Sequence, residues 1–332
     1  MWYSARGDVR GYGEDQAWRS AMMRCAGLCA LAAVALLGIQ GVAVGAEGVP
    51  LAFKFSLGEV LTYEVSVTGA GSLRSSEGDV SAVGVQGGLS LSCRVAEVLA
   101  DGSGRLEARM PRANLQVNVG QQSARFSYEN GRLRWFANGQ ERTPPDADLS
   151  QAPLLGTPIV FTVAPNGRMS GVSLADPRLL GALQQAVPGL PIGQLPQGTE
   201  QLFPDGPVGV GETWRKSAQF TPFGPTMPIT LTTSRTLDSV SEEGGLAKIS
   251  GYSEARFQAS QVKMSPGGTE VSVAVPQLRE TIASTEFFDT SRGRLLRADY
   301  DVSFSTLVSI TAGEEKRDGG GEARFHITVQ AR

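Results

Sequence analysis

The sequence predicts a mainly β protein of curved antiparallel sheets, half-barrel or barrel-like in form, with one amphipathic helix near residues 176–187. Two observations carry this prediction. Apolar and polar residues alternate with a period of two along most of the chain after residue 46, and glycine-containing turns separate the alternating segments. Such alternation buries one face of each strand and leaves the other in water, which is typical of antiparallel sheet.

The first part of the chain has the three-part pattern of a secretory signal. Residues 25–44 are uncharged, Arg19 and Arg24 precede them, and small residues end the segment at Ala46. We therefore expect residues 1–46 to be a signal peptide, with translation starting at Met22 or Met23, and the protein to be exported to the periplasm or beyond the cell. An uncleaved membrane anchor is the alternative, since the segment is about long enough to span a bilayer.

The cysteines follow from this expectation. Cys25 and Cys29 lie within the signal segment, so the exported protein keeps Cys93 and forms no disulfide within the chain. Cys93 falls among Leu89, Leu91 and Val95 on the apolar side of an alternating segment. We expect a buried, unreactive thiol there rather than a nucleophile.

Five segments show the alternation most clearly, and in each the apolar residues share one side of the expected strand. The shared sides are Leu61, Tyr63, Val65, Val67; Leu106, Ala108, Met110; Leu115, Val117, Val119; Val302, Phe304, Thr306, Val308, Ile310; and Ala323, Phe325, Ile327, Val329. Four turns before strands repeat a Gly-Arg-Leu or Gly-Arg-Met sequence, at Gly104, Gly131, Gly167 and Gly293. Hairpins of this kind need a residue with positive φ, which glycine adopts without steric cost.

One helix is predicted, over residues 176–187. Asp176 is a good N-cap, Pro177 suits the first helical position, and Pro188 ends the segment. Its apolar side carries Leu179, Leu180 and Leu183, and we expect this side to cover a face of the sheet. These leucines, together with Trp135 and Trp214, are the candidate residues of a ligand cavity. An ordinary hydrophobic core is the alternative for each of them.

A Pro- and Gly-rich stretch over residues 188–211 divides the chain after the signal segment. Short segments on its two sides are alike: Leu57-Gly58-Glu59 resembles Val210-Gly211-Glu212, and residues 89–106 resemble residues 229–246. We interpret this as a degenerate duplication of a β-module. The predicted organisation is a first β-module with the helix over 47–200 and a second over 201–332.

These motifs carry a family resemblance. The segment from Phe203 to Trp214, which ends in Gly-Glu-Thr-Trp, and the later Phe288-Asp289 with Gly293-Arg294-Leu295 resemble a group of uncharacterised exported bacterial β-rich proteins. More loosely, the pattern is similar to the periplasmic lipoprotein-carrier half-barrels, in which a curved antiparallel sheet wraps helices around an apolar cavity. This second likeness is one of architecture. Neither resemblance implies catalytic residues.

Most catalytic and metal-binding chemistry is disfavoured by composition. The single histidine, His326, is expected on the solvent-exposed face of a strand. We therefore expect no Ser-His-Asp site, no zinc site and no other cofactor. A carboxylate site needs only acids, and Glu286, Asp289, Asp299 and Asp301 are its candidates. Asp299 and Asp301 share one side of a strand, where pairing with nearby arginines is the simpler interpretation.

A formal net charge of −3 offers no electrostatic surface for nucleic acid or for an anionic membrane. Membrane association is expected only through the signal segment, if it is not cleaved. We therefore expect an exported, non-enzymatic binding protein of the cell envelope, for an apolar or amphipathic ligand such as a lipid, or for another envelope protein. The alternative is a structural or interaction module without a pocket, and a weaker alternative is a carboxylate-based hydrolase.

Overall fold

The computed structural model describes residues 48–74, 78–142, 156–174, 202–220, 229–241, 245–257, 260–264, 271–312 and 315–332. The expected signal peptide and the helix expected over 176–187 lie outside these residues. No helix in the described ranges is long and apolar enough to cross a membrane.

The described strands belong to one 15-stranded sheet in which every pairing is antiparallel. The strands are β1 (Val60–Arg74), β2 (Val80–Val98), β3 (Gly104–Val119), β4 (Gln122–Glu129), β5 (Arg132–Ala137), β6 (Gln140–Arg142), β7 (Ile159–Val163), β8 (Met169–Leu174), β9 (Thr213–Phe220), β10 (Ile229–Val240), β11 (Leu246–Phe257), β12 (Ser260–Met264), β13 (Val271–Asp289), β14 (Arg294–Ala312) and β15 (Glu315–Ala331). The predicted mainly β, curved antiparallel fold is confirmed.

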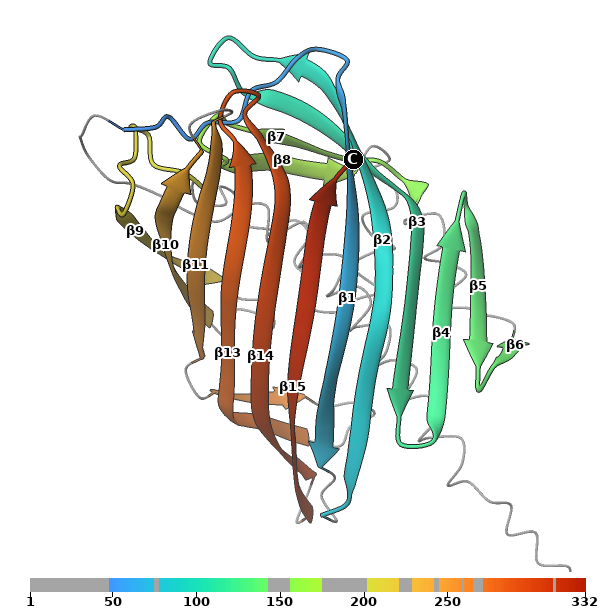
Figure 1. The fold of residues 1–332 in the computed structure, drawn as a ribbon. Coiled ribbons are helices and arrows are strands. Elements are labelled where there is room, and N and C mark those ends of the chain that lie inside the picture. Colours follow the sequence, from blue (N-terminus) through green and yellow to red (C-terminus); the bar gives the residue numbers. More distant parts are fainter. Residues whose placement is uncertain are drawn as a thin grey trace, which may run out of the picture.

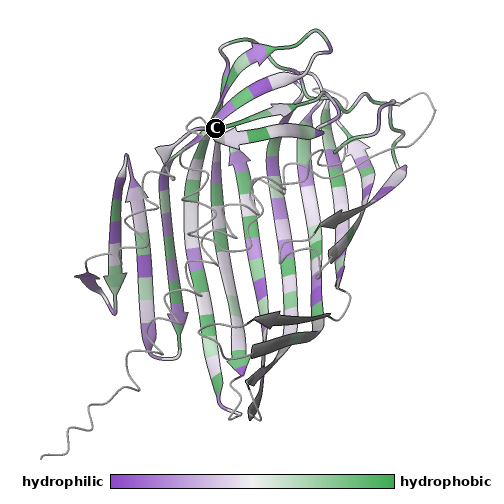
Figure 2. Ribbon diagram, turned by 180° about the vertical axis from the view of Figure 1, so that it is seen from behind, coloured by the Kyte–Doolittle hydropathy of each residue, from purple (hydrophilic) through white to green (hydrophobic). Residues whose placement is uncertain are grey.

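The strand order is β6-β5-β4-β3-β2-β1-β15-β14-β13-β11-β10-β9, as Figure 1 shows from one edge to the other. β1 pairs with β15, so strands from both ends of the described chain lie side by side in the centre. Strands from both expected modules thus contribute to one sheet, while the division near residue 200 stays a prediction. Hydropathy alternates along the long strands in Figure 2, as expected for a sheet with one buried face.

β3 joins two of the expected alternating segments into one strand. Its buried residues are Leu106 and Ala108 in the first part and Ala113 and Leu115 in the second, so the buried side changes between even and odd positions. The β2–β3 register shifts between Ser90 and Ser92, where β3 has two residues, Met110 and Pro111, opposite Leu91 of β2, so that one extra residue forms a bulge. The bulge keeps both apolar segments on the same face of the sheet.

One end of the sheet is covered by three segments that we call the cap: residues 48–58, residues 156–174 with the β7–β8 hairpin, and residues 202–212. The hairpin lies across the sheet at the end that holds the C-terminus (Figure 1) and pairs with β3. Val49 and Val208 exchange two backbone hydrogen bonds of 2.9 and 3.0 Å. The cap segments therefore form hydrogen bonds with one another as well as with the sheet.

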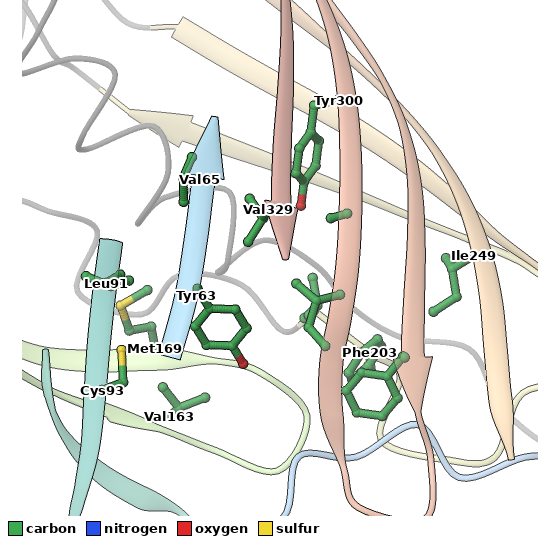
Figure 3. Close-up of a cluster of buried hydrophobic side chains, with 14 of the residues drawn as sticks. Tyr63, Val65, Leu91, Cys93, Val163, Met169, Phe203, Ile249, Tyr300 and Val329 are labelled. Carbon is green, nitrogen blue, oxygen red and sulfur yellow. The ribbon is translucent and has the colours of Figure 1, made fainter. Parts of the chain in front are cut away.

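Aromatic packing joins the cap to the sheet. The rings of Phe203 and Phe288 lie 4.7 Å apart between centroids, and Phe53 lies 5.3 Å from Phe288 in an edge-on arrangement. Val95 and Ile249 are fully buried nearby. Each such side chain contributes about 1.5–3 kcal/mol through removal from water. This end of the sheet is a conventional hydrophobic core (Figure 3).

The expected glycine turns form as predicted at three of the four positions. Gly131, Gly167 and Gly293 have φ of 85°, 84° and 64°. At the remaining turn the positive φ of 82° belongs to Gly102 instead. Gly104 is required for another reason, because a Cβ there would lie 2.5 Å from the ring of Phe55 in the cap.

Candidate functional site

The face of the sheet that carries the hydrophobic core is called the inner face. Figure 3 shows Tyr63, Leu91, Tyr300 and Val329 of four different strands among the buried side chains of this face, with Met169 of the cap near Leu91 and Cys93. Cys93 lies on the same face and is buried, and burial raises the pKa of its thiol to about 12. The expected burial of this thiol is confirmed, and its raised pKa disfavours the reactive thiolate.

Away from the cap, directly paired residues form four rows across the inner face, counted from the cap. The first row is Leu133, Tyr128, Ala113, Leu89, Val65, Val329, Ala298, Glu286, Ile249, Leu237. The second is Trp135, Phe126, Leu115, Gly87, Val67, Ile327, Tyr300, Ser284, Gly251, Arg235, Trp214. The third is Ala137, Ala124, Val117, Val85, Gly69, Phe325, Val302, Ile282, Ser253, Thr233, Lys216. The fourth is Gln122, Val119, Val83, Gly71, Ala323, Phe304, Glu280, Ala255, Leu231.

The two sequence-predicted tryptophans stand at the ends of the second row. Trp135 on β5 and Trp214 on β9 are 7% and 1% exposed, and the indole N–H of Trp214 donates to the backbone oxygen of Leu202 at 3.3 Å. Both therefore serve as core residues at opposite edges of one face. The other predicted cavity residues, Leu179, Leu180 and Leu183, lie outside the described residues, so their role stays a prediction.

The four rows divide the inner face into two halves. The apolar half comprises the row members on β1–β5, β14 and β15, none of which is charged. The polar half comprises the members on β9, β10, β11 and β13. It contains every charged member of the rows: Lys216, Arg235, Glu280 and Glu286. An apolar surface thus lies directly beside a surface that carries charge.

The third row of the apolar half is partly buried at all its members except the buried Ala124, unlike the core below the cap. Val85, Val117, Val302 and Phe325 pack against the core and keep some solvent exposure. Gly69 makes room for the Phe325 ring, because a Cβ at position 69 would lie 2.3 Å from ring atom Cδ1. The result is a continuous apolar surface that the described cap does not seal.

The polar half contains a buried ion pair that reaches across a strand. Arg235 on β10 donates to Glu286 Oε1 on β13 from Nε at 3.2 Å and from Nη2 at 2.9 Å, and the two side chains are 5% and 2% exposed. β11 lies between them. Its residue at the crossing point is Gly251, where a Cβ would lie 3.4 Å from Arg235 Cγ and 2.3 Å from Ser284 Oγ. Glycine at this position leaves space for the arginine to cross β11.

Hydroxyl groups surround this pair. Ser284 donates to Glu286 Oε1 at 3.4 Å, and Ser253 donates to Thr233 at 2.7 Å in the next row. The pKa of the Tyr300 phenol is raised, mainly by burial and further by the nearby Glu286 carboxylate. Two buried charges are costly unless they are paired and hydrogen-bonded, and here both conditions are met.

Glu280 differs from Glu286 although both lie on the inner side of β13. Its direct partners across the sheet are Ala255 on β11 and Phe304 on β14. Burial raises the pKa of its carboxyl. This residue escaped sequence analysis, although Leu278, Ile282 and Phe288 share its even-numbered side of the strand and mark that side as apolar.

The outer face carries the carboxylates that the sequence placed on one side of a strand. Asp299 and Asp301 are there, as predicted, and His326 lies between them and is half exposed, as expected for a wet-face histidine. Asp299 pairs with Arg297 on its own strand, which lowers the pKa of Asp299. Glu286 is on the opposite face, so it forms no common site with these acids.

Thr328, His326 and Asp301 are aligned like a hydroxyl–imidazole–carboxylate relay. Thr328 Oγ1 lies 3.3 Å from His326 Nε2, and His326 Nδ1 lies 2.9 Å from Asp301. The threonine proton, however, is donated to Asp299 at 2.9 Å rather than to the imidazole. Asp301 is 77% exposed, so water screens the relay. This arrangement is a surface hydrogen-bond network without the nucleophile–base bond that catalysis requires.

No group of three or more His, Cys, Asp or Glu side chains in the described ranges has the arrangement of a metal site. Asp289, the remaining acidic candidate, accepts hydrogen bonds from Ser291 and from the backbone N–H of Arg292, and these hydrogen bonds lower its pKa. It stabilises the turn before β14.

Comparison with known proteins finds no sequence relative and only distant structural similarity. No family model matches the sequence, and no curated protein matches it. Among solved structures, the chain is similar to OccK5 (OpdH) of Pseudomonas aeruginosa at 8% identity and a TM-score of 0.20, over 82% of this chain and 98% of that one. It is similar to an outer membrane channel of Pseudomonas putida F1 at 7% identity and a TM-score of 0.21, over 88% of this chain and 100% of that one. Likeness at this level is no basis for an inference about function.

Proposed function

We propose that this chain is an exported, non-enzymatic protein of the cell envelope that binds an amphipathic ligand along the inner face of its curved sheet. The observation that supports this proposal is the division of that face. A partly exposed apolar half on β1–β5, β14 and β15 lies beside a polar half on β9–β11 and β13. A ligand with an apolar chain and a polar head matches both halves at once.

The proposed division of labour follows from the chemistry of each half. The apolar half gains free energy by removing an alkyl or ring system from water, at about 25 cal/mol per Å² of buried apolar surface. The polar half supplies hydroxyl and carboxyl groups that form hydrogen bonds with the head group and orient it. The predicted helix over 176–187 is proposed to cover this face, as its apolar side would match the apolar half.

One observation favours the alternative of a structural module without a pocket. Trp135 and Trp214, the residues expected to line a cavity, are nearly fully buried, as in an ordinary core. The two alternatives differ in what the purified protein retains. A binding protein holds extractable ligand, whereas a structural module does not.

The test is native mass spectrometry of the exported protein before and after organic extraction, with two matched variants. Val302 lies on the inner face and is partly buried, whereas the neighbouring Ser303 lies on the outer face and is exposed. We expect wild type and Ser303→Lys to carry an extractable amphipathic mass and Val302→Lys to lose it. Val302→Ala, which keeps the fold, should retain less ligand than wild type. Clean spectra of wild type in repeated preparations would favour the structural module.

A further inference from the structure

The two inner-face glutamates of β13 have different surroundings. Glu286 is paired with Arg235 and accepts a hydrogen bond from Ser284. Glu280 makes no hydrogen bond or ion pair with any residue in the described ranges, although it is mostly buried and its cross-strand partners are Ala255 and Phe304. A carboxyl group in such surroundings is destabilising unless something compensates it.

No cation of the described inner face lies beside Glu280. The adjacent inner-face positions on its own strand are Leu278 and Ile282, and those on β14 are Val302 and Thr306. On β11 the nearest is Ser253. All of these are uncharged, so no neighbour in the rows offsets a negative charge at Glu280.

The charged residues of the same strands point away or lie further off. Arg279 and Arg256 are cross-strand partners on the outer face, and Glu254 and Asp301 also lie on that face. The two inner-face cations of the rows are Arg235 on β10, which pairs with Glu286, and Lys216 on β9, with β10 and β11 between it and β13. Within the described ranges, the carboxyl of Glu280 thus has no charged neighbour on the inner face, and it lies at the edge of the apolar half.

We propose that Glu280 binds the protonated amine of the ligand's head group, while the ligand's apolar chain lies against Phe304, Val302 and Phe325. This inference rests on the proposed function and names the class of ligand, a long-chain or lipid amine. A carboxylate and an ammonium group form a charge-assisted hydrogen bond, which is roughly twice as strong as a neutral one. The amine supplies a positive charge that none of the described inner-face neighbours of Glu280 provides.

Binding of the protonated amine is coupled to the release of a proton from Glu280. Burial raises the pKa of the empty carboxyl, so at a given pH Glu280 holds its proton more often than an exposed glutamate does. Binding of an ammonium ion favours the carboxylate, and that proton is released to water. Affinity for an alkylamine should therefore increase with pH until Glu280 is ionised in the empty protein, as long as the amine itself stays protonated.

The experiment measures binding of dodecylamine and of dodecanol to the full exported protein by isothermal titration calorimetry. The two probes share the chain and differ in the head group. We expect wild type to bind dodecylamine about tenfold or more tightly than dodecanol. Glu280→Gln should lower the affinity for dodecylamine and so remove that preference. Glu322→Gln, an exposed outer-face change, is the matched control and should behave as wild type.

The outcomes separate the head-group inference from the proposed function. Equal affinity of wild type for the two probes would overturn the role of Glu280 while supporting an apolar binding face. Binding of neither probe would overturn both. If Glu280→Gln fails to fold, the head-group preference of wild type and its increase with pH still decide the matter, since neither measurement needs the variant.

Discussion

The apolar and polar halves of the inner face are built on the same backbone and differ in what their side chains need. In the apolar half, Val85, Val117 and Phe325 are stabilised by any contact that excludes water. In the polar half, Arg235 and Glu286 are stable only because each has the other, at 2.9 Å. The comparison shows that the apolar half needs only contacts that exclude water, whereas the buried charges of the polar half need partners of opposite charge.

The largest expected effect is in the polar half. Arg235→Met or Glu286→Leu alone should lower the free energy of unfolding by about 3–5 kcal/mol, because each leaves a buried charge without its partner. The double variant should lose less than either single variant, since no charge remains buried. Urea denaturation of the three variants measures this coupling. Additive losses would mean that the two charges act independently.

A smaller effect is expected in the apolar half, where shape matters. Gly69→Ala places a Cβ 2.3 Å from the Phe325 ring and 2.8 Å from a backbone oxygen, so we expect a loss of about 1–3 kcal/mol. Gly84→Ala is the matched control, because its Cβ would meet nothing closer than Asn118 at 3.7 Å. Its effect should stay within about 0.5 kcal/mol. Equal losses in thermal unfolding would contradict this account of Gly69.

The pH dependence of stability should differ between the two faces. The raised pKa of Glu280 means that the folded protein binds this proton more tightly than the unfolded chain does. Its contribution is therefore present at low pH and is lost as pH increases from the ordinary glutamate pKa through the raised value. Asp299 has a lowered pKa, so its contribution is present at neutral pH and is lost as pH falls.

Two variants measure these opposite slopes. Glu280→Gln should flatten the decline of stability above the ordinary glutamate pKa, whereas Asp299→Asn should flatten the decline at acid pH. Denaturant titrations from acid to neutral pH provide the comparison. Parallel curves for wild type and Glu280→Gln would show that Glu280 titrates alike in the folded and unfolded chain.

The smallest effect is expected at His326. Its contacts with Asp301 and Thr328 are on the outer face and open to water. His326→Ala should change stability by less than about 1 kcal/mol and leave ligand retention unaltered. A loss of bound ligand in native mass spectra of this variant would place a functional site on the outer face.

The sequence was sufficient to predict five alternating segments, which lie in β1, β3, β14 and β15, and the buried side of each. Alternation at Val65 and Val67 on β1, and at Ile327 and Val329 on β15, follows directly from burial of one face. Even the bulge in β3 left a signal, because the apolar positions change from even at Ala108 to odd at Leu115. The alternation of apolar and polar residues predicts which face of the sheet a residue lies on, since successive side chains of a strand point to opposite faces.

The contacts between side chains of different strands on the inner face could not be predicted in the same way. Arg235 and Glu286 meet across β11, and their contact depends on the register of three strands and on Gly251. Glu286 also seemed to belong with Asp299, which follows it closely in sequence but lies on the other face. The apolar residues at even-numbered positions of β13 were the sequence feature that could have placed both Glu280 and Glu286 on the inner face. Pairing across non-adjacent strands has no comparable signature in one sequence.

Photo-crosslinking with a diazirine-bearing alkyl probe tests the inner-face site most directly. Labelled residues, located by mass spectrometry of the digested protein, should cluster at Val302, Phe304 and Phe325 in the apolar half. Labelling should disappear in Val302→Lys and persist in Ser303→Lys. Labelling at outer-face positions such as Ser303 and Arg324, or equal labelling of both faces, would contradict binding of the ligand on the inner face.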